Sequence, residues 1–180
     1  MKVLADGDSL PAALRDVIER RAAAESRRAA TAGSHPPFDL VYVASRRLKV
    51  SWPALFVLVE AGPGAADERI IELAEPGDLA LTRDLPLAEA LVDKGITVLN
   101  DRGTVFTIEN ARERRSLRDL ALEFRGLGIE AESPRATTWG KVELKGFSDA
   151  FDRELGKALR RNELLKKIGH GGTEARRGEG

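Results

Sequence analysis

Four aspartates are spaced along the chain so that they could share one site. Asp6 and Asp8 directly follow the first apolar run, whereas Asp67 and Asp84 come much later, each after a further apolar run. Carboxylates brought together repel one another unless a cation neutralises them or some of them take up protons. Oxygen ligands of this kind suit hard divalent ions such as Mg²⁺ or Mn²⁺. Such a cluster can activate a water molecule and stabilise a phosphodiester transition state.

Each of these aspartates also has a simpler interpretation. Asp67 could be a helix-start residue that the helix dipole favours, and Asp84, which precedes Leu85-Pro86, could only cap a helix. Asp78 comes before a predicted strand and is expected to have a structural role in a turn. The recurrence of aspartates at equivalent strand ends is what favours a shared metal site.

The elements that would position these aspartates alternate between strand and helix. Apolar runs predict strands over residues 2–5, 40–43, 55–59, 79–82 and 96–99. Helical spacing and Pro or Gly boundaries predict helices over residues 11–31, 67–73, 86–94, 107–127 and 147–159. This βαβ alternation predicts a three-layer α/β/α fold with a mostly parallel central sheet of about five strands. Ligands of such sheets bind outside the carboxyl ends of the strands, where the aspartates are expected.

Composition and length predict one soluble globular domain. The chain has 180 residues, of which 42% are hydrophobic and 32% charged, and its formal net charge is zero. We expect a single domain over residues 1–168 and a disordered tail over residues 169–180, which are rich in glycine. No cysteine is available for a disulfide or a thiolate site, and no apolar run approaches the roughly 20 residues that span a bilayer. We therefore expect a cytoplasmic protein without a membrane partner.

Other kinds of catalytic site have weaker support in the sequence. Ser9 and Ser45 have no histidine in a plausible position to act as a base, which argues against a serine hydrolase. The turn Gly62-Pro63-Gly64 lacks the lysine and the spacing of a phosphate-binding P-loop.

The motifs resemble those of a known group over nearly the whole chain, from Met1 to about Leu159. They share an order and a pattern of acidic and polar residues: Asp6-Gly7-Asp8 followed by Pro11, Ala66-Asp67, residues 77–88, Asn100-Asp101-Arg102-Gly103, Thr107-Ile108-Glu109-Asn110, and Arg112 to Arg118. With these motifs the chain resembles the YaiI/YqxD family of uncharacterised bacterial proteins, which is related to PIN-like nucleases. It departs from the family pattern at Leu10, where the family has cysteine, and at Arg83, where the family has a small residue.

The resemblance implies a PIN-like fold and, by extension from PIN domains, a metal-dependent ribonuclease. It places Asp6, Asp8, Asp67 and Asp84 on the acidic positions of the family, as catalytic residues and as ligands of Mg²⁺ or Mn²⁺. Four further residues match its polar signature and are expected to hold the site or contact an RNA substrate: Thr82, Asn100, Arg102 and Asn110. An arginine at position 83 could neutralise the acidic cluster without a metal.

Two other functions remain open at this point. Asp6-Gly7-Asp8-Ser9 after a first strand also resembles the nucleophile and acid of haloacid-dehalogenase-like phosphatases, in which Asp6 would be phosphorylated and Asp8 would donate a proton. Ser45 and Lys94 are poor matches to the other residues that such a phosphatase needs. The third possibility is a non-catalytic RNA-binding protein of the same fold, which would bind RNA in a salt-sensitive, metal-independent way.

Overall fold

The computed structural model describes residues 1–50, 54–110, 112–113, 116 and 140–171. Within these residues the strands are β1 (Lys2–Asp6), β2 (Asp39–Ala44), β3 (Leu55–Leu58), β4 (Leu79–Leu81), β5 (Thr97–Leu99) and β6 (Val105–Phe106). The helices are α1 (Ala12–Thr31), α2 (Ala65–Leu73), α3 (Leu85–Asp93) and α5 (Lys141–Gly171). Residues 108–110, 112–113 and 116 are also helical. The remainder of the helix predicted over residues 107–127 lies outside the described residues.

The strands form one sheet in the order β3-β2-β1-β4-β5-β6. β1 to β5 run parallel, and β6 runs antiparallel to β5. The prediction of about five strands missed β6, which has only two residues. Residues 100–104 are too short to form a crossover, so the chain reverses directly and adds β6 as an antiparallel edge strand.

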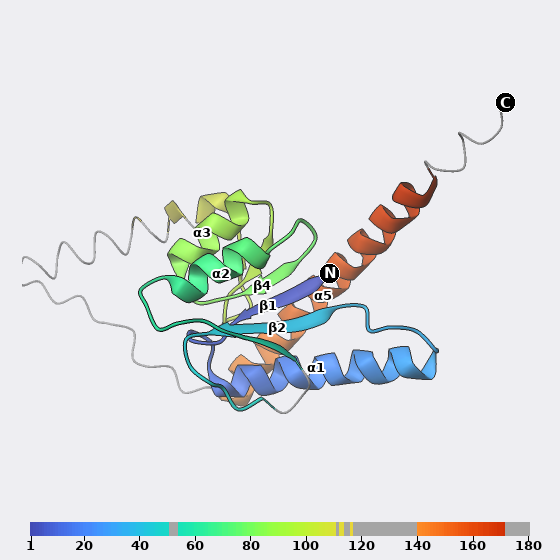
Figure 1. The fold of residues 1–180 in the computed structure, drawn as a ribbon, viewed down its shortest axis with the longest axis horizontal. Coiled ribbons are helices and arrows are strands. Elements are labelled where there is room, and N and C mark those ends of the chain that lie inside the picture. The colour runs from blue at the N-terminus through green and yellow to red at the C-terminus, as the bar shows by residue number, and fades with distance from the viewer. Residues whose placement is uncertain (51–53, 111, 114–115, 117–139, 172–180) are drawn as a thin grey trace, which may run out of the picture.

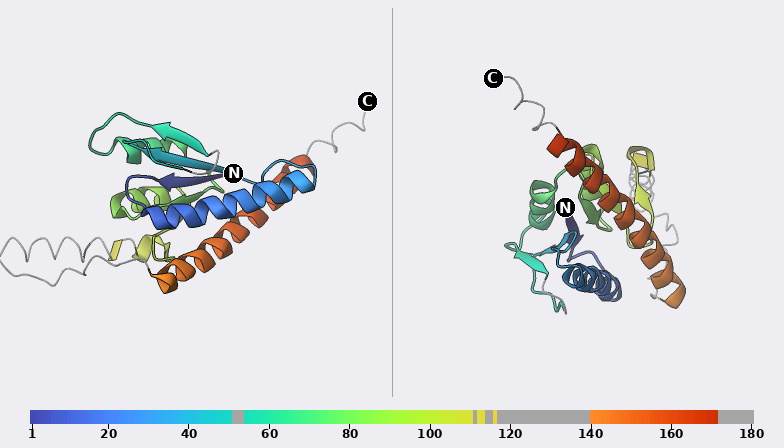
Figure 2. Two further views of the ribbon diagram at one scale, coloured as in Figure 1. Left: turned by 90° about the horizontal axis from the view of Figure 1, so that it is seen from below. Right: turned by 90° about the vertical axis from the view of Figure 1, so that its right-hand side faces the viewer.

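Helices cover both faces of the sheet, which confirms the predicted three-layer α/β/α architecture (Figures 1 and 2). Because successive residues of a strand point to opposite faces, Val3 and Ala5 pack under α1 and α5, while Leu4 packs under α2 and α3. On α5, Phe147 and Phe151 are fully buried and their rings stack 6.0 Å apart. The hydrophobic core is therefore divided by the sheet into two layers.

Helix α5 is longer than predicted. It runs from Lys141 to Gly171 and lies beside α1 before extending past the body of the protein (Figure 2). The predicted tail was expected to begin at residue 169, but the helix includes residues up to Gly171, and residues 172–180 lie outside the described part of the chain. No helix among the described residues combines the length and the apolar character needed to cross a membrane.

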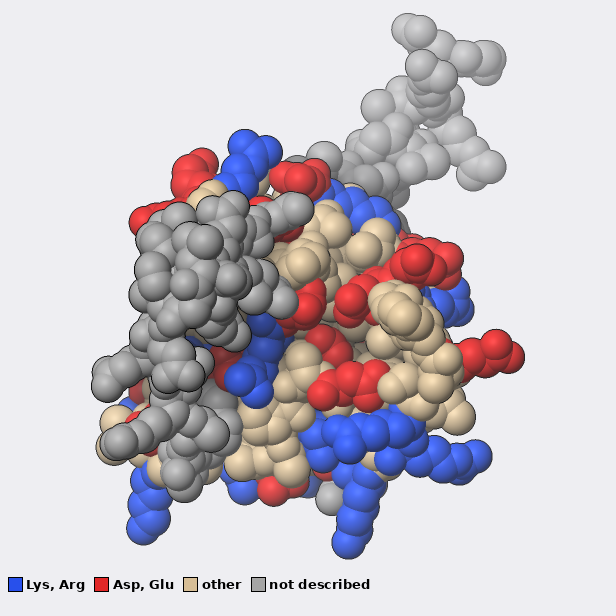
Figure 3. Space-filling model, turned by 90° about the vertical axis from the view of Figure 1, so that its left-hand side faces the viewer, with Lys and Arg blue, Asp and Glu red and all other residues tan. Residues whose placement is uncertain are grey.

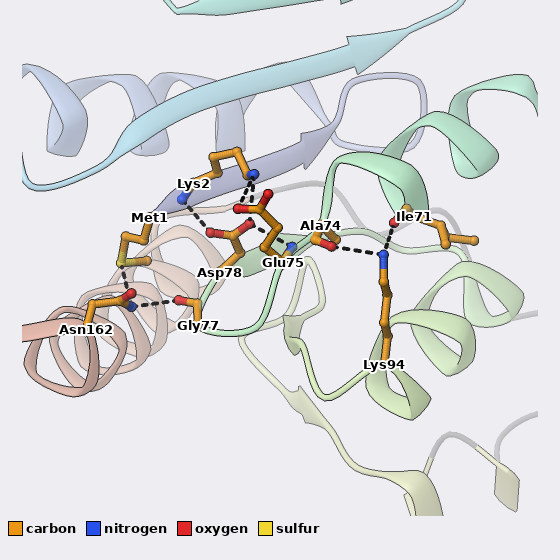
Figure 4. Close-up of polar contacts among 9 residues, drawn as sticks. All are labelled: Met1, Lys2, Ile71, Ala74, Glu75, Gly77, Asp78, Lys94 and Asn162. Atoms are coloured by element: carbon orange, nitrogen blue, oxygen red, sulfur yellow. Dashed lines mark hydrogen bonds and ion pairs between the residues drawn. The ribbon is translucent and has the colours of Figure 1, made fainter. Parts of the chain in front are cut away.

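A polar network occupies the amino ends of β1 and β4 (Figure 4). Asp78 is buried and accepts hydrogen bonds from the backbone N–H of Lys2 at 2.6 Å and of Glu75 at 3.0 Å. The Lys2 ammonium lies 2.9 Å from Glu75 and 3.6 Å from Asp78. Asn162 on α5 donates to the carbonyl of Gly77 at 2.9 Å. Asp78 therefore has the structural role expected for it.

The ends of α2 and α3 are joined by a lysine side chain, also drawn in Figure 4. Lys94, the residue after α3, donates from its ammonium to the carbonyl of Ile71 at 2.5 Å and to the carbonyl of Ala74 at 2.9 Å. These carbonyls belong to the last turn of α2 and its cap, so Lys94 satisfies acceptors that a helix leaves open at its carboxyl end.

Candidate acidic site at the carboxyl ends of the strands

Asp6 is the best-fixed residue of the candidate site. It is the last residue of β1, and only 3% of its surface is exposed. Its Oδ2 accepts a hydrogen bond from the Thr82 hydroxyl at 2.7 Å. Its Oδ1 accepts from the backbone N–H of Asp8 at 3.2 Å and of Ser9 at 3.1 Å. The central strand and the following turn thus hold this carboxylate in one orientation.

Asp8 is tied to the loop that follows β2. Its Oδ2 accepts from the Ser45 backbone N–H at 2.7 Å, and its Oδ1 lies 3.6 Å from the Arg46 Nε. The turn that carries Asp8 approaches the neighbouring strand closely, because the Gly7 N–H donates to the Val43 carbonyl at 2.8 Å. Parallel pairing of β1 with β2 therefore brings Asp8 beside the end of β2.

Asp84 begins α3 as its N-cap residue. Its Oδ1 accepts from the Leu87 N–H at 2.9 Å, and its own N–H donates to the Thr82 hydroxyl oxygen at 3.0 Å. Thr82 thus connects Asp84 with Asp6 through a single hydroxyl group. Asp84 therefore caps a helix, as its simpler interpretation predicted, and it also lines the cavity described below.

Asp67 lies in the first turn of α2, at a helix start formed by Gly64 in the left-handed conformation, with φ of 75°. Burial raises the pKa of its carboxyl group, and repulsion from Asp84, Asp6 and Asp8 raises it further, to about 6. An opposite charge nearby would have lowered this pKa instead. The second cause is consistent with the cavity lining described below, in which Asp67 shares one cavity with the other three aspartates.

These side chains line one open cavity of about 300 Å³. Its lining consists of the four aspartates with small or hydroxyl residues: Asp6, Asp8, Asp67, Asp84, Ser9, Ser45, Gly62, Gly64 and Ala66. Figure 3 looks onto the carboxyl ends of the strands, where acidic side chains gather and basic side chains border them. The structure therefore brings together all four aspartates that the sequence assigned to one site.

The side chains at this cavity are of the type that binds a hydrated hard cation, but they are not arranged to coordinate one completely. All four candidate ligands are carboxylates, the donor type that Mg²⁺ and Mn²⁺ prefer. However, among the described residues no group of three or more Asp, Glu, His or Cys side chains is arranged to hold an ion directly. Mg²⁺ commonly keeps several waters and uses only one or two carboxylates. The cavity is compatible with that mode of binding.

Of the four residues predicted to hold the site or contact RNA, Thr82 contacts Asp6 and Asp84, whereas the other three lie in the segments after β5 and β6. Asn100 accepts from the N–H groups of Arg102 at 2.9 Å and Thr104 at 2.8 Å, which closes the turn between β5 and β6. At the next helix start, the Thr107 N–H donates to Oδ1 of Asn110 at 2.9 Å. The Asn110 N–H donates in return to the Thr107 hydroxyl oxygen at 3.3 Å. Neither asparagine nor Arg102 lines the acidic cavity.

Arg83 pairs with an aspartate outside the predicted set. Its Nε lies 2.8 Å from Oδ2 of Asp101, whose side chain is 11% exposed. Arg83 makes no ion pair with the four aspartates of the cavity within the described parts of the chain. The sequence pointed to Asp101 only as part of a motif. Its position two residues after the end of β5 is the signal that could have selected it.

Ser9 also has a part in the site that the sequence did not suggest. Its hydroxyl oxygen accepts from the Arg83 N–H at 3.2 Å and lies 3.4 Å from the Thr82 hydroxyl oxygen. The loops after β1 and β4 are thereby joined at the floor of the cavity.

Comparison with known proteins places the chain among uncharacterised relatives. The family model described as "Uncharacterized BCR, YaiI/YqxD family" matches residues 4–157. A UPF0178 protein from Treponema denticola is 37% identical over 164 residues, which cover 91% of this chain and 97% of the relative. UPF0178 proteins from Syntrophobacter fumaroxidans and Myxococcus xanthus are each 38% identical, over 89% and 86% of this chain and 97% and 94% of the relatives. None of these names states an activity, a substrate or a cofactor.

Proposed function

We propose that this chain, which belongs to the YaiI/YqxD family of uncharacterised proteins, is a metal-dependent phosphodiesterase that cleaves RNA. The observation that carries the proposal is the gathering of four carboxylates at one cavity, where Arg46 is the one cation within ion-pair distance in the described chain. Asp6, Asp8, Asp67 and Asp84 line it together, and the pKa of Asp67 is raised to about 6. The resemblance to PIN-like nucleases directs the proposal to RNA as the substrate.

The residues of the cavity would divide the work according to their surroundings. Asp6 and Asp84 would be direct ligands of Mg²⁺ or Mn²⁺, while Asp8 and Asp67 would complete the cluster or act through water. A divalent ion bound there would lower the pKa of a coordinated water and offset charge that develops on the phosphate. Thr82 would position both direct ligands, because its hydroxyl donates to Asp6 and accepts from the Asp84 N–H.

Asp67 is our choice for the group that accepts a proton from the attacking water. This choice rests on the position of Asp67 in the cavity lining, at the first turn of α2. Burial and the acidic neighbours raise the pKa of Asp67 to about 6 in the ion-free cavity, and a bound cation would lower that pKa. Asp67 also projects from a different element than Asp6 and Asp84, so the three carboxylates reach the cavity from separate directions.

The phosphatase alternative has less support from the surroundings of Asp6. Such a phosphatase also needs a lysine beside its nucleophile, whereas the Lys94 ammonium donates to the carbonyls of Ile71 and Ala74 and does not line the cavity that holds Asp6. The non-catalytic alternative would use the same fold without any ion. It would not explain why four carboxylates are kept together, since their mutual repulsion costs stability.

Calorimetric titration of Mn²⁺ and of Mg²⁺ into the purified protein tests the proposal. We expect saturable binding to the wild type and loss of that binding in Asp84→Asn. Asparagine caps helices as well as aspartate does, so this variant should keep the fold while losing the charge. Asp93→Asn, which removes an exposed charge at the other end of α3, is the matched control and should bind like the wild type.

RNA cleavage is then measured with the ion that binds. Cleavage that requires the ion and is lost in Asp84→Asn would support the phosphodiesterase. Absence of binding by both ions, or cleavage that persists in Asp84→Asn or in the presence of a chelator, would refute it. Transfer of phosphate to Asp6 would instead favour the phosphatase.

A further inference from the structure

A basic loop borders the acidic cavity. It follows β2 and carries three exposed cationic side chains, those of Arg46, Arg47 and Lys49. We call these three residues the basic rim. Arg47 and Lys49 make no ion pair with any residue in the described ranges, so their charge is available to a ligand. In Figure 3, basic side chains lie along one border of the acidic group on this face.

The rim is fixed to the turn that carries Asp8. Leu48, between the basic residues, packs against the hydrophobic core. A Cβ atom at Gly7 would overlap with the Leu48 Cδ1, so glycine is what lets the loop approach this turn. The hydrogen bond from the Ser45 N–H to Asp8 at 2.7 Å adds a second attachment. The position of the rim relative to the cavity is therefore set by packing.

The two arginines closest to the acidic residues differ in how firmly they are held. Arg83 is paired at 2.8 Å with Asp101, a mostly buried carboxylate, and serves to neutralise it. Arg46 lies 3.6 Å from Asp8 through its Nε and its side chain is 70% exposed. A guanidinium held this loosely can exchange its carboxylate partner for a phosphate, which it binds with a similar two-pronged geometry.

We propose that Arg46, Arg47 and Lys49 bind the phosphates of an RNA strand on one side of the bond that the cavity cleaves. The location of the scissile bond rests on the proposed function, but binding by the rim does not require cleavage. The whole chain has zero net charge, so no overall field draws in a polyanion. An RNA strand that crosses a cavity of four carboxylates needs a local positive surface, and the rim provides one directly beside Asp8.

The test is the binding of a fluorescent RNA oligonucleotide, followed by anisotropy in EDTA over a range of salt concentrations. The variant Arg46→Ala/Arg47→Ala/Lys49→Ala keeps Leu48 and so keeps the anchor of the loop. The matched control Arg20→Ala/Arg27→Ala/Arg161→Ala removes the same charge from exposed positions on α1 and α5. DNA of the same sequence is measured in parallel.

We expect the rim variant to bind RNA about tenfold or more weakly than the wild type. The slope of log K against log salt concentration should become shallower by about two, while the control variant binds like the wild type. Equal losses in the rim and control variants would overturn the proposal, as would unchanged binding in the rim variant. Tighter binding of DNA than RNA would contradict RNA as the ligand. If RNA binding depends on the rim but no divalent ion supports cleavage, the proposed activity is refuted and RNA binding by the rim is supported. If cleavage depends on Asp84 but neither cleavage nor RNA binding depends on the rim, the activity is supported and the role of the rim is refuted.

Discussion

The acidic groups at the two ends of the parallel sheet have opposite surroundings. At the amino end, Asp78 receives two backbone N–H groups and lies near the Lys2 ammonium. At the carboxyl end, four aspartates share a cavity, and Arg46 is the one cation within ion-pair distance of them in the described chain. Burial lowers the pKa of Lys2, but its contacts with Glu75 and Asp78 outweigh burial and raise the pKa, so the charged form of Lys2 is favoured. At the other end, burial and neighbouring carboxylates raise the pKa of Asp67, so its charged form is disfavoured.

This difference distinguishes a carboxylate that stabilises the fold from carboxylates whose arrangement suits the binding of a ligand. The carboxylate of Asp78 closes the turn between α2 and β4 and fastens the start of β1, so its contacts favour the folded state. The carboxylates of the cavity repel each other, so their proximity costs stability unless a ligand offsets it. Clusters with perturbed pKa values that packing alone does not explain are good candidates for functional sites.

Removal of a central carboxylate should have the largest effect. In Asp6→Asn we expect divalent-ion binding to disappear and ion-dependent RNA cleavage to fall by at least about a hundredfold. The asparagine can still accept hydrogen bonds through its one oxygen, so the urea midpoint should change far less than the activity. Cleavage and calorimetry on the same preparation measure both. Full cleavage in a folded Asp6→Asn variant would show that this end of the sheet is not the catalytic one.

The converse substitution at the amino end should affect stability and leave ion binding unchanged. Asp78→Ala removes the acceptor of two partly buried N–H groups, which we expect to cost about 2 to 3 kcal/mol in the free energy of unfolding measured with urea. Glu75→Gln, at an exposed partner of the same lysine, should leave the unfolding midpoint unchanged. An Asp78→Ala protein as stable as the wild type would remove the contrast between the two ends.

A third substitution tests how rigidly the acidic end is assembled. Gly7→Val places a side chain where Leu48 and Ala44 already lie, and we expect it to cost about 2 kcal/mol through overpacking. The double variant Gly7→Val/Leu48→Ala should recover part of this loss in urea unfolding, since the nearest contact is then removed. Strictly additive losses would indicate that Leu48 does not pack against this turn.

The smallest expected effect concerns pH. The folded-state pKa of Asp67, about 6, is above its ordinary value of 3.8, so the folded protein holds this proton more tightly than the unfolded chain. The contribution of Asp67 to wild-type stability should therefore fall as pH rises from about 4 through about 6. Asp67→Asn lacks this loss and should be more stable than the wild type at pH 8, by about 1 kcal/mol because the group is partly exposed and screened. Urea unfolding at pH 4 and pH 8 measures it; a stability difference between variant and wild type that is the same at both pH values would contradict an origin in the titration of Asp67.

Much of the fold could be predicted from the sequence because apolar runs and helix boundaries agree with each other. The strand-end rule also selected the four aspartates that share the cavity, since parallel strands place their carboxyl ends at one edge. β6 was missed because two residues carry no periodicity. The pairing of Arg83 with Asp101 could not be foreseen, because the direction of an arginine side chain depends on loop geometry rather than on sequence spacing. The packing of Leu48 on Gly7 likewise arises only in the folded chain.

The hydrogen bonds of Lys94 have a mechanical consequence for the cavity. α2 and α3 each have nine residues and are thus about 13 Å long, and Lys94 joins them at their distal ends. Asp67 and Asp84 stand at the proximal ends of the same two helices. The distance between these two carboxylates is therefore set by two helices that Lys94 joins at their far ends. The lysine contacts lie about one to two turns from Asp67 along α2, and Lys94 lies nearly three turns from Asp84 along α3.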